Sequence, residues 1–350
     1  MQIDTSKPVM VTGATGYVAG WVIKRLLEEG LTVHAAVRNP DNTEKRAHLD
    51  KIASETSGVI RYFKADLLDD GSYRDAMAGC GTVFHTASPF IVTVDDPQRD
   101  LVDPALNGTR NVLQSVNATE TVTRVVLTSS CAAIYGDAAD LLDLPDQTMT
   151  EEIWNTSSRI DMRPYSYSKT VAEQAAWDIA KAQERWRLVV VNPSFVMGPS
   201  LNKSPTSESF SVMRQIGDGT MKMGAPDLHF ALVDVRDLAE AHLRAAFKPD
   251  AEGRHIISGH NTGVWEWTQL LRPEFGAKYP LPKKLLPKWL VWLIGPILSR
   301  DITRDFISRN FGIPLKADNS KSREKLGMTY RPLEKTVTEM FQQLVDTNQI

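Results

Sequence analysis

The sequence predicts an α/β fold, in which a doubly wound parallel sheet is followed by a smaller C-terminal lobe. Three observations predict it. Short β-branched runs alternate with helical stretches over residues 9–192, a glycine-rich turn separates the first strand from the first helix, and the pattern changes after Pro193. Alternation of strands and helices is typical of a parallel sheet with helices on both faces.

The expected strands are short and rich in Val, Ile and Thr, and they lie at 9–12, 32–37, 59–64, 82–86, 124–129 and 187–192. Between the first two, apolar residues recur with helical spacing up to Gly30, a residue type that favours the end of a helix. This apolar stripe consists of Val18, Val22, Ile23, Leu26 and Leu27.

After Pro193, Pro, Ser and Gly become frequent over 197–224, and short helices with Pro-rich turns dominate 268–350. A helical pattern at 235–246 and a strand-like run at 254–258 interrupt this region. We therefore expect a first domain over 1–195, to which 229–258 returns. The remaining segments, 196–228 and 259–350, are expected to form the smaller lobe that covers a substrate.

The composition excludes several classes of protein. Hydrophobic residues make up 42% and charged residues 24%, as in an ordinary globular protein, and the net charge of −3 gives no electrostatic reason to expect nucleic acid as a partner. Cys80 and Cys131 lie far apart, without the spacing of a metal site or a disulfide framework. We expect no bound metal and a reducing, cytoplasmic location.

No signal-peptide pattern precedes the first strand, and the longest apolar run, 289–298, is about ten residues too short to span a bilayer. Pro287 before this run and Gly295-Pro296 inside it favour a short buried or lid helix. The alternative is peripheral membrane contact through Trp289 and Trp292. We expect no membrane span.

The glycine-rich turn is the strongest local signal. Gly13 permits a tight turn, Gly16 allows the backbone to approach a pyrophosphate, and Ala19 is small enough for the helix to pack on the sheet. The helix N-terminus adds amide donors and a positive dipole end. At a strand–turn–helix junction ahead of repeated β–α units, this pattern predicts a Rossmann-type dinucleotide site.

The end of the second strand predicts which dinucleotide binds. An acidic residue there would select NAD, but the segment reads Val37-Arg38 and contains no Asp or Glu. Arg38, with Lys45 nearby, can neutralise a 2′-phosphate through charge-assisted hydrogen bonds. NADP is therefore favoured, with an ordinary solvated Arg38 as the alternative.

Two further strand ends are expected to face the cofactor. Asp66, in the run 64–67, is placed to accept from the adenine amino group, although it could equally cap a helix. The fourth strand leads into 86–88, whose backbone could line the cofactor. His85, inside that strand, is interpreted as structural.

Tyr165 and Lys169 are the predicted proton-transfer pair. They are four residues apart at the start of a helical stretch, so they face the same side. A phenol with an ordinary pKa near 10 is too weakly ionised to act as a base at neutral pH, and a neighbouring ammonium favours its ionised form. The spacing alone recurs by chance in helices, and Tyr167 is a rival tyrosine.

A serine pair supports this interpretation. The fifth strand ends at Thr128-Ser129-Ser130, at the carboxyl edge where α/β sheets bind ligands. A hydroxyl there can hold a substrate carbonyl beside Tyr165. The alternative for both serines is ordinary turn chemistry.

These residues resemble the extended short-chain dehydrogenase/reductase family, most closely its branch of dihydroflavonol-reductase-like and methylglyoxal/aldehyde-reductase-like proteins. The resemblance covers almost the whole chain. It is carried by 12–20, 37–38, 64–67, 83–89, 128–130, 165–169, 192–194 and 232–237.

The resemblance implies a catalytic triad of Ser130, Tyr165 and Lys169, because the family places the catalytic serine second in its Ser-Ser pair. It also implies that Tyr165 protonates the substrate oxygen during hydride transfer, that Lys169 binds the nicotinamide ribose, and that Asp234 and Asp237 are structural. The expected cofactor contacts are Gly13, Thr15, Gly16, Tyr17, Val18, Arg38, Lys45, Asp66, Leu67, Thr86, Ala87, Ser88, Thr128, Tyr165, Lys169, Pro193, Ser194 and Val196.

Two departures from the family pattern are visible. Ala19 replaces a glycine common in the branch, and Ile134-Tyr135 stand roughly where plant dihydroflavonol reductases carry a substrate-reading asparagine. We expect 134–163 and 200–227 to choose the substrate.

The expected activity is NADPH-dependent reduction of a small aldehyde or ketone by a monomer or homodimer. The rivals are a sugar-nucleotide epimerase or dehydratase, a hydroxysteroid dehydrogenase, and an NADP-sensing protein without activity. Cys131-Ala132 after Ser130 disfavours a dehydratase, and Arg38 disfavours an NAD-dependent epimerase.

Overall fold

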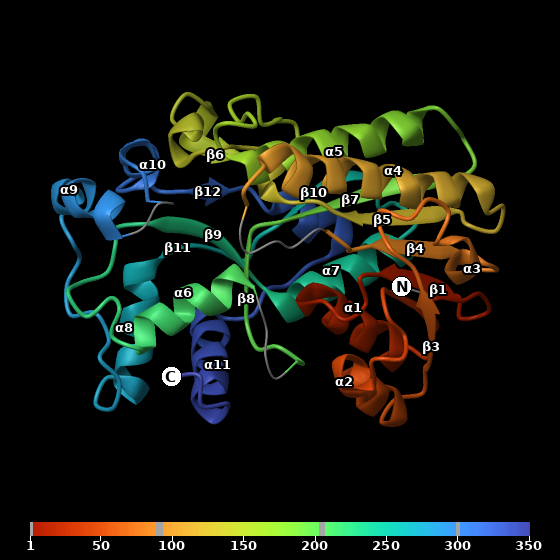
Figure 1. Cartoon of the computed structure of the whole chain (residues 1–350), viewed down its shortest axis with the longest axis horizontal. Coiled ribbons are helices and arrows are strands. Elements are labelled where there is room, and N and C mark those ends of the chain that lie inside the picture. The colour runs from red at the N-terminus through yellow and green to blue at the C-terminus, as the bar shows by residue number, and fades with distance from the viewer. Residues whose placement is uncertain (1–2, 89–93, 203–206, 299–301) are drawn as a thin grey trace.

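The structure is a computed structural model of the chain and describes residues 3–88, 94–202, 207–298 and 302–350. Its main feature is a seven-stranded sheet of order β10-β7-β5-β4-β1-β2-β3, in which every neighbouring pair is parallel (Figure 1). The strands are β1 (Val9–Thr12), β2 (Thr32–Val37), β3 (Val59–Lys64), β4 (Thr82–His85), β5 (Arg124–Thr128), β7 (Arg187–Pro193) and β10 (Gly253–Ile257). The predicted α/β fold is confirmed.

Helices cover both faces of this sheet (Figure 1). On one face α1 (Tyr17–Glu28), α2 (Thr43–Ser54) and α7 (Val235–Phe247) share an apolar core with the strands. On the other face lie α3 (Arg74–Met77), α4 (Asp103–Ala118) and α5 (Pro164–Lys181), with a short π-helix, η1 (Gln98–Val102), leading into α4. Apart from the edge strand β3, the strands are mostly buried, so their sequences are apolar runs.

The first helix shows how the sequence sets these boundaries. Val22, Ile23, Leu26 and Leu27 are fully or almost fully buried, as their helical spacing predicts. The helix ends at Glu28, and Gly30, two residues further on, adopts the left-handed φ of 77° that favours glycine. The Gly30 and Leu31 amides donate to the carbonyls of Leu27 and Leu26, so the end of the helix is capped by its own backbone.

The smaller lobe has its own sheet, of order β11-β9-β8, made of β8 (Phe195–Met197), β9 (His229–Asp234) and β11 (His260–Gly263). Against it pack α6 (Glu208–Gly217), α8 (Val264–Phe275) and α11 (Leu333–Asp346) around the fully buried Trp267. Two short strands, β6 (Thr148–Met149) and β12 (Lys316–Ala317), pair with each other. The short helical turns are η2 (Cys131–Ala133), η3 (Ala138–Leu141), η4 (Pro145–Gln147) and η5 (Ser322–Leu326).

The returning segment 229–258 is divided between the two parts. Its helix α7 packs on α1 and its strand β10 closes the large sheet beside β7. Its first strand, β9, pairs instead with β8 and β11 in the small sheet. The alternating polar and apolar residues of a strand do not specify its partner, so only the tertiary structure decides which sheet it joins.

Asp234 and Asp237 tie the two parts together. Asp234 caps α7 by accepting from the Arg236 amide (2.8 Å), and it also accepts from Thr336 Oγ1 on α11 (2.8 Å). Asp237 pairs with Arg331, in the segment that leads into α11. These contacts support the structural role that the family resemblance implies for both aspartates.

The apolar run 289–298 forms α9 (Lys288–Leu298), which packs on α10 (Arg304–Asn310). The helix was expected to be buried or to act as a lid, and burial is wrong for its outer face, since Trp289 is 65% and Ile297 83% exposed. A helix can follow from local sequence alone, whereas burial requires a covering element, and none of the described residues covers this face. Within the described ranges, no helix is both long and apolar enough to cross a membrane.

Three buried histidines give the fold a pH dependence. Burial lowers the pKa of His242 to about 4, that of His255 to about 4 and that of His85 to about 3. The unfolded chain has histidines with pKa near 6.5, so it binds more protons than the folded chain between pH 4 and 6.5. Stability is therefore fully present above about pH 6.5 and is lost as the pH falls towards 4.

We expect His242→Gln to weaken this pH dependence, because glutamine does not titrate and can still bond to Thr128 and the Leu238 carbonyl. The slope of unfolding free energy against pH should fall by up to about 1.4 kcal/mol per pH unit, the loss of one proton. Urea denaturation at intervals between pH 4.5 and 7 measures it. An unchanged slope would contradict the assignment of His242 as a buried neutral group.

Candidate active site

Parallel strands place the predicted site residues along one edge. The strands of the large sheet run in the same direction, so the residues that follow β1, β2, β3, β4, β5 and β7 all emerge at its carboxyl edge. The strand order reverses between β1 and β4, which is the switch point where open α/β sheets bind ligands. The structure thus brings together the ends of all the strands that the sequence singled out.

The glycine turn after β1 has the geometry of an anion site. Gly13 has φ of 62°, and a Cβ there would lie 3.0 Å from Ala87, so the turn needs glycine. Gly16 is the N-cap of α1 and supplies no side-chain acceptor, and the first turn holds no acidic residue. The N-terminal amides of α1 are therefore available for a phosphate group, as a dinucleotide requires.

The other residues of the turn differ in what they offer. Thr15 is half-buried at the turn, and Val18 packs its side chain on the sheet core. Tyr17 donates its hydroxyl to the Gly198 carbonyl (2.7 Å), and burial, together with the charge of Asp234, raises its pKa well above the ordinary value. The side chain of Tyr17 thus links α1 to the smaller lobe, so a contact with a phosphate would have to come from its backbone.

Thr12 joins the turn to the end of β4. Its Oγ1 accepts from the amides of Thr86 (3.1 Å) and Ala87 (2.9 Å), and Thr86 Oγ1 donates back to the Thr12 carbonyl (2.5 Å). The hydroxyl proton of Thr12 is then free to donate to Nδ1 of His85 (3.0 Å). Burial first, and the charge of Lys169 second, lower the pKa of His85 to about 3, so it is a neutral structural residue.

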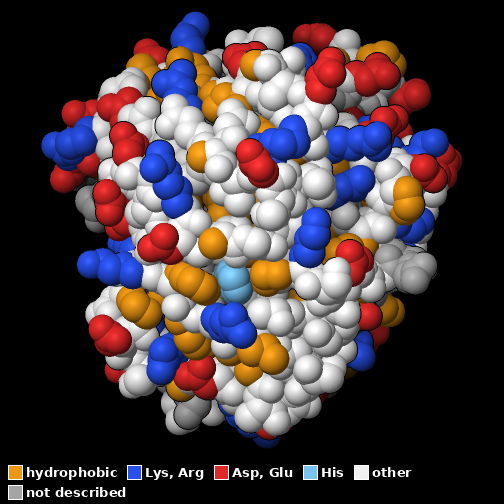
Figure 2. Space-filling view, turned by 90° about the vertical axis from the view of Figure 1, so that its right-hand side faces the viewer, with side chains coloured by type: hydrophobic (Ala, Val, Ile, Leu, Met, Phe, Trp, Pro, Cys, Tyr) orange, Lys and Arg blue, Asp and Glu red, His pale blue; other side chains and the backbone are white. Residues whose placement is uncertain are grey.

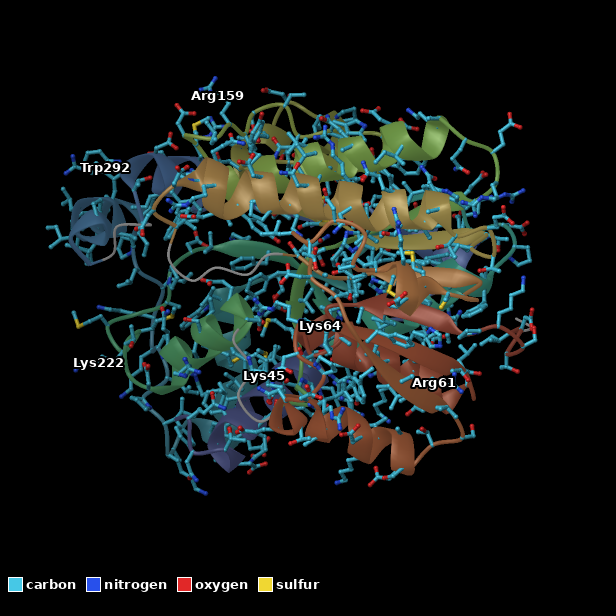
Figure 3. All side chains as sticks on the ribbon, turned by 45° about the vertical axis from the view of Figure 1, so that its right-hand side comes forward. Lys45, Arg61, Lys64, Arg159, Lys222 and Trp292 are labelled. Carbon is cyan, nitrogen blue, oxygen red and sulfur yellow. The ribbon has the colours of Figure 1, made fainter. Side chains whose placement is uncertain are left out.

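The adenosine side carries basic residues. Arg38 follows β2 and is exposed, and Lys45 lies in the first turn of α2, whose N-cap Asn42 accepts from the Lys45 amide. Figure 3 shows Lys45 and Lys64 on the same side of the molecule. Lys64 is the register partner of Val37, so it ends its strand beside Arg38. Lys64 was not among the predicted phosphate contacts, although its place at the end of a strand was visible in the sequence.

Asp66 and Leu67 follow β3 at the same edge. Asp66 Oδ1 accepts from the Leu68 amide (3.0 Å), which is the local turn bond that a capping aspartate makes. Asp66 can therefore cap this turn and also bind adenine, because the second oxygen of its carboxylate can accept from the adenine amino group. Leu67 lines a small pocket that reaches Lys169.

The predicted proton-transfer pair lies at the start of α5. Tyr165 is half-exposed, and the ammonium of Lys169 lies 5.7 Å from the centroid of its ring. Lys169 Nζ donates to Ser88 Oγ (2.9 Å), which comes from the end of β4. The predicted edge residue Ser88 thus holds the lysine, so α5 and β4 together fix the cation beside the phenol.

The two serines after β5 face opposite ways. Ser129 is buried and donates its hydroxyl to Glu173 Oε2 (2.5 Å). Ser130 is only half-buried, and its Oγ accepts from the Ala132 amide (3.1 Å) as the cap of η2. Alternation along an extended chain sends one side chain inward and leaves the next at the edge. This geometry supports Ser130 rather than Ser129 as the hydroxyl that meets a substrate.

Glu173 is a residue of the site that sequence analysis missed. It is 1% exposed, one turn beyond Lys169 on α5, and forms an ion pair with Arg254 of β10 (2.6 Å). It also accepts from Asn192 Nδ2 (2.8 Å), and the same amide donates to the Ser130 carbonyl (3.2 Å). Its spacing of four residues from Lys169, on the same helix face as Tyr165, was visible in the sequence. Its partners could not be foreseen, because they are distant along the chain.

The remaining predicted contacts are turned partly away from the edge. Thr128 donates its hydroxyl to Nε2 of His242 (2.7 Å), and Ser194 donates its own to the Ile257 carbonyl (3.2 Å). Pro193 ends β7 beside Ile257, and Val196 lies in β8, packed against the sheet core. The two hydroxyls are thus already used within the protein, and the other two side chains are apolar, so these residues line the site without offering hydrogen bonds to a ligand.

A parallel sheet that gathers phosphate-binding and proton-transfer groups along one edge defines a dinucleotide-binding protein. The model of the family described as "NAD dependent epimerase/dehydratase family" matches residues 9–258. The chain belongs to this family, the extended short-chain dehydrogenases/reductases, as its sequence predicted.

Known relatives are reductases by name. Cinnamoyl-CoA reductase CAD2 of Medicago truncatula is 34% identical over 96% of this chain and 95% of its own length. Anthocyanidin reductase of Arabidopsis thaliana is 36% identical over 76% of this chain and 80% of its own length. The solved structure of yeast methylglyoxal/isovaleraldehyde reductase Gre2 complexed with NADPH has a TM-score of 0.76 at 26% identity and covers 98% of this chain and 100% of that chain.

The contacts of Glu173 predict an effect of Ser129 on catalysis. Ser129→Ala removes the hydrogen bond that ties the end of β5 to α5 but leaves the Glu173–Arg254 pair intact. We expect kcat for aldehyde reduction to fall about tenfold with little change in the KM for NADPH, since about 1–1.5 kcal/mol of positioning is lost.

The matched control is Trp177→Phe, which removes another hydrogen bond to the same carboxylate (3.3 Å) but touches no residue of the serine segment. Its kcat should stay near that of the wild type. Equal losses of kcat in the two variants, each in proportion to a loss of thermal stability, would mean that Glu173 only stabilises the fold.

Proposed function

We propose that this protein is an NADP(H)-dependent oxidoreductase that reduces the carbonyl group of an aldehyde or ketone to an alcohol, reversibly. The observation that carries the proposal is the Tyr165–Lys169 pair, held at the same sheet edge as the uncapped N-terminus of α1. The reductase names of the relatives, and the NADPH in the Gre2 structure, support it.

The residues at the edge fit NADP(H). The amides at the N-terminus of α1 would hold the pyrophosphate, with Gly13 and Gly16 giving the backbone its close approach. Arg38 and Lys45, with Lys64 beside them, would neutralise the 2′-phosphate. When bound, NADPH supplies the hydride for the carbonyl carbon.

The side chains of this chain would supply the proton and the orientation. Tyr165 donates its hydroxyl proton to the carbonyl oxygen as that oxygen gains negative charge. Ser130 donates a hydrogen bond to the same oxygen and holds it beside the phenol. Lys169, held by Ser88, stabilises the phenolate that remains, because opposite charges in a partly buried site attract strongly.

The two parts of the chain have different roles in this proposal. Residues 1–195 with 229–258 bind the cofactor, although β9 of that segment belongs to the small sheet, and 196–228 with 259–350 cover the substrate, where 203–206 lie outside the described residues. We infer a small-molecule carbonyl substrate, a monomer or homodimer, and a cytoplasmic location. Cys80 and Cys131, which are both free and buried, support a reducing compartment.

Tyr165→Phe tests the proposed chemistry. Removing the hydroxyl leaves the fold and the cofactor site intact but takes away the proton donor, so kcat should fall by about 10²- to 10⁴-fold. NADPH oxidation with a panel of aldehydes, diketones and ketoesters measures it, with NADPH binding followed by fluorescence. Tyr167→Phe, two residues along the same helix, is the control and should keep its activity. Unchanged turnover in Tyr165→Phe would refute the assignment.

Arg38→Ala tests the choice of cofactor. Loss of one charged hydrogen-bonding partner of a phosphate costs about 1.5–3 kcal/mol, so the KM for NADPH should rise roughly 10- to 100-fold while that for NADH changes little. Arg61→Ala serves as the control, because Arg61 lies on the exposed edge strand β3, away from Lys64 in Figure 3. Equal changes in the two KM values would exclude contact with a 2′-phosphate.

A further inference from the structure

The outer face of α9 is an exposed apolar surface. Twelve large hydrophobic side chains are exposed among the described residues, and six of them lie between positions 285 and 297. We call these six the α9 surface: Leu285, Trp289, Trp292, Leu293, Ile294 and Ile297. Five of the six lie on α9 and Leu285 comes three residues before it. Such concentration on one short segment marks an interaction site, since scattered single exposures are the normal state of a protein surface.

The helix is anchored from its inner side only. Val291 is buried against Ile307 and Phe311, and a Cβ at Gly295 would lie 2.9 Å from Ile302. Lys288 Nζ donates to the carbonyls of Ser308 (3.0 Å) and Phe311 (2.7 Å), at the end of α10. The helix is thus fixed in place, while no element among the described residues covers its outer side chains, which recur at spacings of three and four.

The charge along the segment that carries the α9 surface has a single sign, and the one acidic residue of the neighbouring α10, Asp305, pairs with Arg163. Residues 276–298 contain four lysines and no Asp or Glu, in a protein whose net charge is −3. Lys278, Lys283 and Lys284 are exposed, and the guanidinium of Arg304 lies 4.5 Å from the ring centroid of Trp292. The opposite end of the molecule differs, because Figure 2 shows acidic and basic side chains interspersed across it.

The α9 surface also lies at an extremity. Figure 1 places α9 and α10 at the end of the molecule away from α2 and α3, and Figure 3 shows Trp292 at that margin. On its other side α10 is tied to the segment before Tyr165. Arg163 donates to Asp305 (3.1 Å), and Arg309 donates to Asp137 (2.8 Å).

We propose that the α9 surface docks on the surface of an anionic phospholipid bilayer. Tryptophans and branched aliphatic side chains enter the boundary between headgroups and acyl chains, while the lysines attract the negative headgroups. A short helix that lies in the interface needs no length to span the membrane. This inference goes beyond the proposed function and does not depend on it.

The lysines favour a bilayer over a second copy of the chain. A symmetric contact through the α9 surface would place two sets of lysines at one interface without any acidic residue of 276–298 to pair with them. Like charges brought together at an interface destabilise it. An anionic membrane supplies the opposite sign and an apolar layer at once.

Vesicle sedimentation with the full-length chain tests the proposal. The wild type should sediment with vesicles of phosphatidylcholine containing phosphatidylserine, much less with phosphatidylcholine alone, and less again as salt is added. Lys283→Gln/Lys284→Gln should weaken binding to the anionic vesicles about thirtyfold, since each lysine near the surface contributes about 1 kcal/mol. Trp289→Ser/Ile297→Ser should weaken it at least about tenfold.

Val59→Ser is the matched control, because Val59 is 49% exposed yet opens β3, at the end of the molecule away from α9 in Figure 1. It should sediment like the wild type, and the thermal unfolding midpoint of each variant shows whether the fold is kept. Wild-type protein that fails to sediment with anionic vesicles would overturn the proposal. So would a dimer in solution that Trp289→Ser/Ile297→Ser splits, because the surface would then be a contact between copies.

Discussion

The carboxylate of Glu173 joins the elements on which the candidate site depends. It lies on α5, and its partners come from the end of β5, from β7 and from β10. A buried carboxylate is costly unless it is paired and hydrogen-bonded, so each of these elements must hold its place for the charge to be tolerated. Breaking the pair by removing one partner costs about 3–5 kcal/mol.

On α5, Glu173 is buried in the protein interior, whereas Tyr165 is half-exposed at the carboxyl edge of the large sheet. Because Asn192 donates both to Glu173 and to the Ser130 carbonyl, the position of the serine segment is coupled to that of α5. The other support is Ser88, which holds Lys169 from β4. The phenol, the ammonium and the serine hydroxyl therefore receive their relative positions from different strands.

The smaller lobe has a second, separate connection to the site. Asp137 accepts from Arg163, Arg309 and Asn310, so the segment after Ser130, the residues before Tyr165 and α10 meet at one carboxylate. Burial opposes ionisation of Asp137, but these donors hold its pKa below the ordinary value. The C-terminal segment is thereby joined to the wall of the site, next to the α9 surface.

Local signals explain what was predictable. The six expected strands are found within one residue of their predicted ends, because each is a short run rich in apolar or β-branched residues, and all but the edge strand β3 are mostly buried. The glycine turn and the Tyr165–Lys169 spacing were equally visible, since a turn and one helical repeat are short-range features. The choice between Ser129 and Ser130 rested on family resemblance, because sequence alone does not give the direction of a side chain at a strand end.

By itself the sequence determined the α/β alternation, the place of the dinucleotide turn and the absence of an acidic residue after β2. Each is a property of neighbouring residues. The tertiary structure alone decided that β9 joins the small sheet, that Glu173 pairs with Arg254, and that the outer face of α9 stays uncovered. Those features depend on partners that are distant along the chain, and local patterns of hydrophobicity and charge do not specify which distant partner is met.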